Sequence, residues 1–247
     1  MSAEAERLLA VCDATWPPAS LRREGPWAIR DGGGGGKRVS AAIALDPVTD
    51  ADIASAEAAM IDMEQAPLFR IGPDDAALDA LLEARGHARI DPTAIWVAPV
   101  ALLTDRPLPR VTALTVWEPL QIMREIWAQG GIGPSRQAVM ERAPGPKTGL
   151  LGRHRDKPAG AGFVAIHGGV AMVHALEILP HQRRQGVGGW MMRAAAFWAA
   201  EHGAGEVAAL CTEANAGANA LYAGLGMRQA GGYHYRIKPE TETARDD

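Results

Sequence analysis

The sequence predicts an α/β protein made of two tandem units. Runs rich in Val, Ile and Ala alternate along the chain with longer Ala- and Leu-rich runs, the pattern expected when strands and helices follow one another. The two halves also resemble each other: LLEARGH at 81–87 superimposes on LYAGLGM at 221–227 when Gly86 is set on Gly226, a shift of 140 residues. A strand, a helix, a glycine and a second strand recur in this order in both halves, which indicates a duplicated unit.

Length and composition favour a folded core. The chain has 247 residues, 47% of them hydrophobic and 22% charged, so it can bury a core as one large or two small domains without crosslinks. The 25 Lys and Arg against 29 Asp and Glu give a net charge of −4, and no long basic run is available to release counterions from a polyanion. We therefore expect no nucleic acid partner.

Cysteine usage and the apolar segments bear on the compartment. Cys12 and Cys211 form no ligand cluster, so we expect free buried thiols, no metal site and a cytoplasmic protein. The N-terminal segment MSAEAERLLAVCD does not fit a signal peptide. The uncharged segment from Pro158 to Leu176 approaches the length of a membrane span, but Gly168-Gly169 is typical of a hairpin turn between buried strands. We expect no membrane association.

The first half is predicted to open with a helix. Its expected helices are 3–12, 50–65 and 74–85, and its expected strands are 27–30, 38–45, 67–71 and 94–103. Gly86, directly after the third helix, fits a C-terminal cap. The run DGGGGGK between the first two strands lacks the spacing and the Ser or Thr of a Walker phosphate loop, so we interpret it as a flexible hairpin tip.

A segment with two prolines, Thr104 to Arg110, separates the halves and predicts domains of 1–105 and 106–247. The second domain alternates strands and helices in the same way. Its expected helices are 118–129, 135–142, 189–202 and 216–225, and its expected strands are 111–116, 149–155, 162–167, 170–179, 206–211 and 233–238.

The stretch after the strand at 170–179 has the features of an anion-binding loop. Pro180 ends the strand, Arg183 and Arg184 follow, and three glycines at 186, 188 and 189 open the next helix. Glycine lets a ligand approach the backbone closely, and a helix N-terminus offers unpaired N–H groups with a partial positive charge. This arrangement suits a pyrophosphate.

A dinucleotide-binding loop is the competing interpretation of these glycines. The motif GxGxxG fails because Met191 stands at its third glycine position. The looser match Gly160-x-Gly162-x-x-Ala165 lies between strands rather than at a strand-to-helix turn, so it does not support this alternative.

The loop resembles the signature of the GNAT superfamily of acyl-CoA-dependent N-acyltransferases: Arg or Gln, two residues, Gly, one residue, then Gly or Ala, after a strand and a proline. Arg183-Arg184-Gln185-Gly186-Val187-Gly188 fits every position. A second family element is an Asn followed seven residues later by Tyr and then by Leu-Gly-Phe. Asn215, Tyr222 and Leu225-Gly226-Met227 match it, with Met in place of Phe. The resemblance covers 111–238 well and extends weakly to the first half.

The resemblance implies a GNAT-like mixed sheet, mostly antiparallel and flanked by helices, in each unit. It also implies acetyl-CoA as the acyl donor, held in a V-shaped gap between two parallel strands, here 170–179 and 206–211. The implied cofactor-binding residues are Leu176, Ile178, Arg183, Arg184, Gln185, Gly186, Val187, Gly188, Gly189 and Asn215. The amide of Ile178 would face the thioester carbonyl, and Asn215 has an alternative role in capping its own helix.

In this family the acceptor amine attacks the thioester directly, so the reaction needs one acid and one base. Tyr222 stands where the family places the acid that protonates the CoA sulfur. For the base, His174 matches a strand histidine of arylalkylamine-acetylating relatives. Strand alternation predicts His174, Leu176 and Ile178 on one face and Glu177 on the other. Glu177 is the alternative base if a bulge reverses the alternation, and water could replace either.

The first half looks like a degenerate copy without a cofactor loop. Its strand meets its helix through DPVTDAD, which has no glycine and carries Asp46, Asp50 and Asp52. These carboxylates would repel a pyrophosphate and occupy the helix N-terminus themselves. Leu82 stands at the Tyr position and Asp75 at the Asn position, so we expect cofactor binding in the second half alone.

The expected activity is an N-acetyltransferase that moves an acetyl group from acetyl-CoA to a primary amine, on a small molecule or a peptide, in a ternary complex. The alternative is a non-catalytic acyl-CoA-binding sensor or interaction module. The presence of both Tyr222 and His174 favours the enzyme. Because two such units side by side resemble a homodimer, we expect a monomer or a weak dimer.

Overall fold

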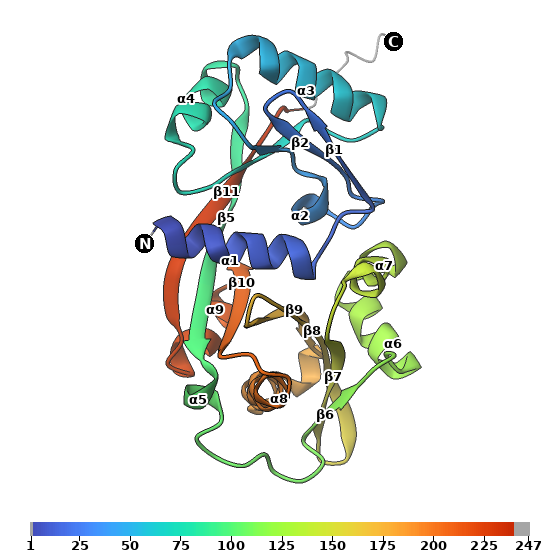
Figure 1. The fold of residues 1–247 in the computed structure, drawn as a ribbon. Coiled ribbons are helices and arrows are strands. Elements are labelled where there is room, and N and C mark those ends of the chain that lie inside the picture. The colour runs from blue at the N-terminus through green and yellow to red at the C-terminus, as the bar shows by residue number, and fades with distance from the viewer. Residues whose placement is uncertain (1, 240–247) are drawn as a thin grey trace.

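A computed structural model of the chain describes residues 2–239 as a mixed α/β structure with helices on both faces of a long sheet (Figure 1). The helices are α1 (Ser2–Thr15), α2 (Lys37–Ser40), α3 (Asp50–Asp62), α4 (Ala76–Ala84), α5 (Val100–Leu103), α6 (Gln121–Gln129), α7 (Pro134–Arg142), the 3-10 turn η1 (Pro180–Gln182), α8 (Val187–Glu201) and α9 (Ala216–Gly224). The strands are β1 (Ser20–Glu24), β2 (Trp27–Asp31), β3 (Ile43–Ala44), β4 (Leu68–Ile71), β5 (Ala88–Pro99), β6 (Ala113–Val116), β7 (Lys147–His154), β8 (Lys157–His167), β9 (Val170–Ile178), β10 (Glu206–Thr212) and β11 (Arg228–Ile237). The predicted fold class, mixed sheets flanked by helices, is confirmed.

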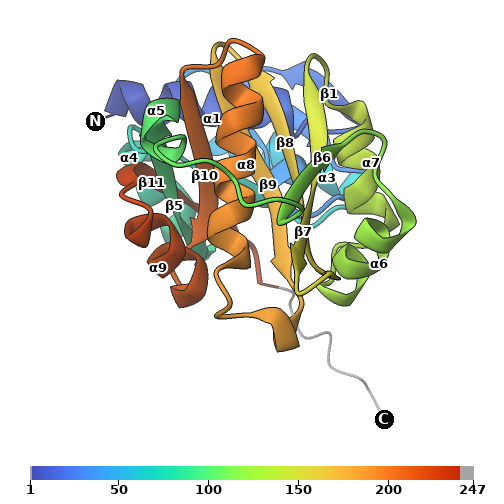
Figure 2. The same ribbon diagram turned by 90° about the horizontal axis from the view of Figure 1, so that it is seen from below.

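The strands form two sheets. β1, β2 and β3 make a three-stranded sheet, and the remaining strands make an eight-stranded sheet in the order β4-β11-β5-β10-β9-β8-β7-β6. The pair β9–β10 is parallel, and the other neighbours in the large sheet are antiparallel. In the second view α8 and α9 lie across the near face of this sheet, while α1 lies behind it (Figure 2).

The two halves of the chain exchange strands. β5 of the first half lies between β10 and β11, and β11 of the second half lies between β4 and β5. The pairing of β10 with β5 sets Cys211 against Ala94, and the pairing of β4 with β11 sets Ile71 against His234. These two pairings are related by the 140-residue shift, and so are the bounds of α4 and α9. The duplicated units therefore form one continuous sheet about a pseudo-twofold axis.

Apolar side chains on both sheet faces hold this arrangement together. α1 packs Leu8 and Cys12 onto Ile95 of β5 and Leu210 of β10, within one buried cluster. α8 packs Met191 and other apolar side chains onto the opposite face, and α6 and α7 cover the β8 end. The sheet joining the halves is thus buried on both faces, which stabilises the exchange through the hydrophobic effect.

The predicted strand 38–45 is wrong over most of its length. Residues 37–40 form the helical turn α2, and only Ile43–Ala44 pair as a strand. The glycine run before it is also not a free hairpin tip, because it packs on α7: a Cβ at Gly35 would lie 2.7 Å from Cγ2 of Val139. The close approach of this loop to the side chain of Val139, which leaves no room for a Cβ at Gly35, could not be inferred without the partner helix.

Two other predictions of the sequence differ at strand ends. β5 begins at Ala88 rather than 94, and β11 begins at Arg228 rather than 233, because each strand is extended by pairing with the other. The residues Val100–Leu103, expected as strand, form the short helix α5.

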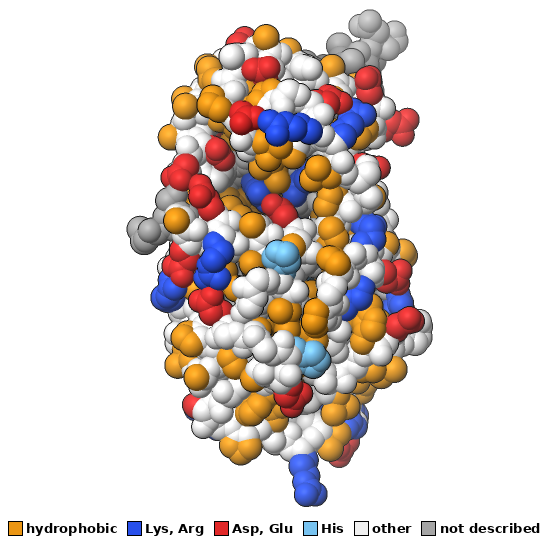
Figure 3. All heavy atoms as spheres, viewed as in Figure 1, with side chains coloured by type: hydrophobic (Ala, Val, Ile, Leu, Met, Phe, Trp, Pro, Cys, Tyr) orange, Lys and Arg blue, Asp and Glu red, His pale blue; other side chains and the backbone are white. Residues whose placement is uncertain are grey.

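Predicted turns are confirmed. Gly168 and Gly169 join β8 to β9 with φ values of 54° and 76°, and the glycines after α4 and α9, Gly86 and Gly226, have φ values of 81° and 77°. Over the part of the chain that the structure describes, no helix has the length and apolar character needed to cross a membrane. On the face seen in Figure 3, basic and acidic side chains are interspersed.

Candidate active site

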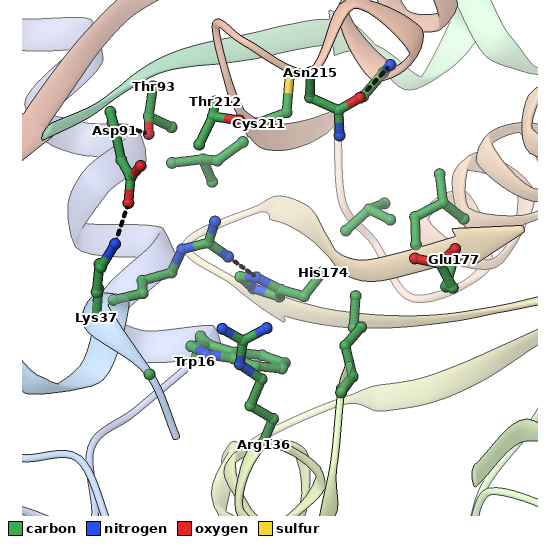
Figure 4. A pocket seen from close by; sticks show the side chains of 18 of the residues that line it. Trp16, Lys37, Asp91, Thr93, Arg136, His174, Glu177, Cys211, Thr212 and Asn215 are labelled. Carbon is green, nitrogen blue, oxygen red and sulfur yellow. Dashed lines mark hydrogen bonds and ion pairs between the residues drawn. The ribbon is translucent and has the colours of Figure 1, made fainter. Parts of the chain in front are cut away.

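The parallel strands β9 and β10 separate partway along their length. They pair from Val170 and Glu206 as far as Val173 and Ala209, after which β9 continues to Ile178 and β10 to Thr212 without pairing to each other. A cavity of about 640 Å³ lies at this opening and is lined by residues of both strands, of α9 and of the first half (Figure 4). The chain therefore has a V-shaped gap at the strands that the sequence resemblance indicates.

A β-bulge in β9 changes which side chains share a face. β9 gains one residue relative to β8 between His174 and Glu177, and Ala175 has a left-handed φ of 50°. Beyond the bulge, Leu176 and Ile178 pack toward α8 with Val173, while Glu177 contacts Gly130 at the end of α6. The expectation that His174 shares a face with Leu176 and Ile178 is therefore wrong, because the extra residue reverses the alternation.

The loop after β9 leads to the N-terminus of α8 beside this gap. Residues 183–186 are exposed, and α8 begins at Val187, two residues earlier than predicted. Arg184 and Gly186 have left-handed φ values of 64° and 78°, a conformation that glycine adopts without strain. The first amides of α8 have no acceptor within the helix, so they are available to an anion.

The side chains of the loop are held unequally. Nε of Arg183 donates to the carbonyl oxygen of Ile178 (3.0 Å), and its guanidinium also pairs with Glu177 (3.0 Å). Arg184 and Gln185 are exposed. A Cβ at Gly188 would lie 3.0 Å from Cδ2 of Leu221, so glycine at this position allows α8 and α9 to pack closely beside the gap.

A groove of about 420 Å³ lies next to the first turn of α8. Its lining includes the basic side chains of Arg110, Arg153 and Arg155 together with Gln185 and Val187. Positive charge is thus concentrated near the exposed amides of the loop, an environment that favours phosphate groups.

α9 contributes Tyr222 and Asn215 to the cavity lining. Tyr222 is 4% exposed, and burial raises the pKa of its phenol, with a smaller contribution from the neighbouring Cys211. Among the described residues, none forms a hydrogen bond with the Tyr222 hydroxyl, whose ring lies 6.2 Å from that of Trp96. The phenol therefore stays protonated at neutral pH and has a free donor.

Asn215 caps α9, since its Oδ1 accepts a hydrogen bond from the amide of Ala218 (3.0 Å). This is the alternative role that the sequence allowed. The sequence analysis missed Asn219, one turn later, which ties three elements together. Its Nδ2 donates to the carbonyl oxygens of Thr212 and Asn215, and its Oδ1 accepts from the indole of Trp96. No local pattern identifies this residue, because its partner Trp96 comes from the first half.

His174 is enclosed by residues of the first half. Its Nε2 lies 2.8 Å from Oγ1 of Thr15, and its Nδ1 lies 3.4 Å from a guanidinium nitrogen of Arg38. Thr15 donates its own hydroxyl to the carbonyl oxygen of Val11, so it accepts from Nε2–H, and Arg38 donates to Nδ1. The imidazole also stacks on Trp16 at 4.9 Å.

This environment keeps His174 neutral. The side chain is 2% exposed, and burial, followed by the positive charge of Arg38, lowers its pKa well below the ordinary value. A neutral imidazole has one lone pair for accepting a proton, and Arg38 occupies it. Glu177, on the same face of β9 after the bulge, has carboxylate oxygens at the cavity, although one is paired with Arg183.

The first half forms the opposite wall of the cavity. Its contributions are Trp16, the loop residues Gly35, Gly36, Lys37 and Arg38, and Asp91 and Thr93 of β5. Figure 4 shows Lys37 and Asp91 joined across the cavity from His174. The sequence around these residues contains no motif that assigns them to a site. They become part of the cavity because the fold brings residues 16–38 next to β9.

The equivalent loop of the first half is closed by its own side chains. The amide of Thr49 donates to Oδ2 of Asp52 at 2.8 Å at the start of α3, and Asp50 pairs with Arg85 at 2.9 Å. These hydrogen bonds from Thr49 lower the pKa of Asp52. The N-terminus of α3 is thus occupied by a carboxylate, as the three aspartates of DPVTDAD predict.

In the described residues, no three His, Cys, Asp or Glu side chains form a group that could hold a metal ion. The arrangement instead combines a strand gap, an exposed amide loop, a protonated phenol and a carboxylate. These features are the ones that the sequence resemblance implies for the gap between β9 and β10.

Comparison with protein families agrees with this resemblance. Residues 117–227 match the family described as the acetyltransferase (GNAT) family, so this part of the chain is similar to a GNAT domain. No curated protein gave a significant sequence match.

Solved structures show the same fold over nearly the whole chain. A GCN5-related N-acetyltransferase from Kribbella flavida has a TM-score of 0.72 at 20% identity, with 97% of each chain covered. A conserved protein of unknown function from Staphylococcus epidermidis has a TM-score of 0.68 at 12% identity, covering 92% of this chain and 96% of the other. A tandem GNAT protein from the clavulanic acid biosynthesis pathway has a TM-score of 0.59 at 15% identity, covering 92% and 86%.

Proposed function

We propose that the chain is an N-acetyltransferase that moves an acetyl group from acetyl-CoA to a primary amine by direct attack in a ternary complex. The observation that carries this proposal is the separation of β9 from β10 after Val173 and Ala209, with an exposed loop of unpaired amides at the same opening. A thioester in the gap and a diphosphate on the loop would then belong to one molecule.

The loop residues would bind the diphosphate through backbone amides. Gly186, Val187, Gly188 and Gly189 would supply N–H groups at the positive end of α8, with Arg183, Arg184 and Gln185 around them. Acetyl-CoA brings an electrophilic thioester carbonyl and a thiolate leaving group. The amide of Ile178 would stabilise the carbonyl oxygen as it becomes negative, and Leu176 would pack against the pantetheine arm.

The acceptor reacts as a neutral amine, so its ammonium form must first lose a proton. Two groups on β9 are candidates for this base. His174 was favoured by the sequence, but its nitrogens are engaged by Thr15 and Arg38 and its pKa is low. Glu177 has the alternative position that a bulge allows, and the bulge at Ala175 supports it. We assign proton removal to Glu177, directly or through a water, and a positioning role to His174.

Attack by the amine nitrogen forms the new C–N bond as the C–S bond breaks. The thiolate that leaves must be protonated, and Tyr222 is the donor we assign. Burial holds the proton on the phenol and also makes a thiolate at the same place more basic, so the transfer is favoured by the same environment. The proton that the attacking nitrogen still carries in excess returns, through water, to the Tyr222 phenolate, and Glu177 releases the proton it took from the ammonium to solvent, so the whole reaction liberates one proton.

The proposed first domain, 1–105, would not bind acetyl-CoA. Asp52 already occupies the helix N-terminus that would correspond to the cofactor loop. Its role would instead be to form the acceptor wall, since Trp16 and Arg38 contact His174. In the single chain this unit would take the place of a second subunit.

The proposal is tested by measuring acetyl-CoA binding by calorimetry and thiol release with a panel of primary amines. We expect binding by the wild type, and release of CoA that depends on an amine. Tyr222→Phe should lower kcat by about 10²-fold or more with little change in acetyl-CoA affinity. Tyr235→Phe is the matched control, because Tyr235 is another buried phenol at the same cavity.

The base is tested separately with Glu177→Gln and His174→Gln. In the wild type, kcat/KM should rise with pH on the acidic side of its pH profile as the base loses its proton. In Glu177→Gln this rise should disappear, so kcat/KM should be nearly independent of pH there. His174→Gln should keep the rise and raise the acceptor KM. If acetyl-CoA binds but Tyr222→Phe changes no rate with any amine, the chain is the acyl-CoA sensor instead.

A further inference from the structure

The cavity has more positive than negative charge left unpaired on its acceptor side. Two of its cations, Arg38 from the glycine loop of the first half and Arg136 from α7, line it together. No carboxylate in residues 2–239 lies within ion-pair distance of either guanidinium. The two arginines come from different halves of the chain, and Arg136 reaches the glycine loop that precedes Arg38: a Cβ at Gly36 would lie 3.0 Å from a guanidinium nitrogen of Arg136.

The other charged residues of the cavity already have partners. Lys37 forms an ion pair with Asp91 at 2.6 Å, and Glu177 forms one with Arg183 at 3.0 Å. His174 is held neutral, because its pKa is lowered by burial and by Arg38 itself. The cavity therefore offers no negative charge to compensate Arg38 and Arg136.

Arg38 is also incompletely hydrogen-bonded. Its Nε is buried and has no hydrogen-bond partner, while one terminal nitrogen makes the 3.4 Å contact with His174 and the guanidinium also interacts with the phenol of Tyr233. A buried donor without an acceptor is uncommon and destabilising, so it needs an explanation at the place where it occurs. Arg136 lies in the first turn of α7, whose N-terminus adds further positive potential.

We infer that the acceptor amine carries an acidic group, a carboxylate or a phosphate, which binds to Arg38 and Arg136. This inference rests on the proposed function, since it names the substrate class of the same site. The guanidinium fork of arginine matches such anions in a bidentate way. The amine end of the acceptor lies toward Glu177, and its apolar part packs beside Trp16.

The inference is tested by comparing matched acceptors that differ only in the acidic group. L-Amino acids are compared with the amines left after removal of their carboxylate, and O-phosphoethanolamine is compared with ethanolamine. We expect an acidic acceptor to have kcat/KM at least about 100-fold above its neutral partner. A higher kcat/KM for amino acids than for O-phosphoethanolamine identifies the anion as a carboxylate, and the reverse order identifies it as a phosphate. A neutral amine as the best acceptor overturns the inference.

Variants of Arg38 connect the preference to the structure. Arg38→Met should raise KM for the acidic acceptor about 10- to 100-fold more than it raises KM for the neutral partner, and should leave acetyl-CoA affinity intact. Arg38→Lys keeps the charge without the fork and should recover only part of the loss. Arg22→Met, on the exposed strand β1 and outside the lining of the cavity, is the matched control for loss of an arginine. Equal effects of Arg38→Met on both acceptors would overturn the inference.

Binding without turnover separates this inference from the proposed function. Calorimetry with N-acetyl amino acids and the matching N-alkylacetamides reports the anion site even if no thiol is released. If the N-acetyl amino acids bind in an Arg38-dependent way but acetyl-CoA does not bind, the proposed function is wrong and the anion site is supported. If neutral amines are acetylated but no acidic probe binds, the proposed function is supported and the anion site is wrong.

Discussion

The indole Nε1 of Trp96 donates a hydrogen bond to Oδ1 of Asn219 at 3.0 Å, and the two residues come from different halves of the chain. The same oxygen accepts from the thiol of Cys211 at 3.2 Å. Nδ2 of Asn219 donates to the carbonyl oxygens of Thr212 (3.0 Å) and Asn215 (2.9 Å). One amide therefore connects β5, the end of β10 and the first turn of α9, directly beside the cavity.

Asn219→Ala should destabilise the protein by about 2–3 kcal/mol, because it leaves the indole of Trp96 and the thiol of Cys211 without their acceptor and removes a side-chain donor from the carbonyls of Thr212 and Asn215. Asn215→Ala is the matched control, since it removes only a helix cap and should cost about 1 kcal/mol. The measurement is equilibrium unfolding in urea. Equal losses for the two variants would show that the connection between the halves contributes nothing beyond ordinary capping.

Gly186→Ala should weaken acetyl-CoA binding about 10-fold or more. Gly186 has φ 78°, so alanine strains the backbone at the loop, and its methyl group lies where the diphosphate would approach. Gly203 has the same φ of 78°, at the other end of α8, and a Cβ there meets open space. Gly203→Ala should therefore lose similar stability and keep full affinity. Similar affinities for both variants, measured by calorimetry, would place the diphosphate elsewhere.

Stability should fall as the pH is lowered from 6.5 to 5. The folded-state pKa values of His174 and His87 are lowered by burial, so below pH 6.5 the unfolded chain binds protons that the folded chain does not. A histidine that stays neutral contributes a loss of about 1.4 kcal/mol per pH unit in this window. The lowered pKa values of Asp52 and Asp79 add their effect only at lower pH.

The contribution of His174 is separated by measuring urea unfolding at both pH values for His174→Gln. The slope between pH 6.5 and 5 should be clearly shallower than in the wild type. His202→Gln, which removes an exposed histidine, is the control for loss of an imidazole. A wild-type free energy of unfolding that is flat across this range contradicts the prediction.

Separation of the chain at residue 105 should give two fragments that do not fold alone. β5 belongs to 1–105 but lies between β10 and β11, so 106–247 alone would expose two inner strand edges. The mixed fragments should form a 1:1 complex with the far-ultraviolet spectrum of the intact chain. Cooperative unfolding of 106–247 by itself, in circular dichroism, would contradict this.

Much of the fold could be predicted because its signals are local. Gly168-Gly169 marks the β8–β9 turn, Gly86 and Gly226 end their helices, and the repeat at 140 residues gives α4 and α9 the same bounds. The exchange of β5 and β11 could not be predicted, since either strand has the same pattern whether it pairs within its own half or across. Pairing is decided by tertiary packing.

The candidate site divides in the same way. Loop glycines and Tyr222 carry a sequence motif, so the cofactor side could be predicted as a set. The bulge at Ala175 has no motif, and it alone decides that Glu177 rather than Leu176 lies on the face of His174. Arg38 and Trp16 reach the cavity only through the three-dimensional arrangement of the halves, and the glycines before Arg38 were interpreted as a free turn.

The cavity takes one wall from each repeat, and only one repeat keeps an open helix end. Under the proposed function, mutations in the N-terminal copy would change which amine is admitted while the donor side stays intact. The acceptor could then diverge through changes in one gene segment, whereas in a dimer of identical subunits each mutation would alter both copies at once.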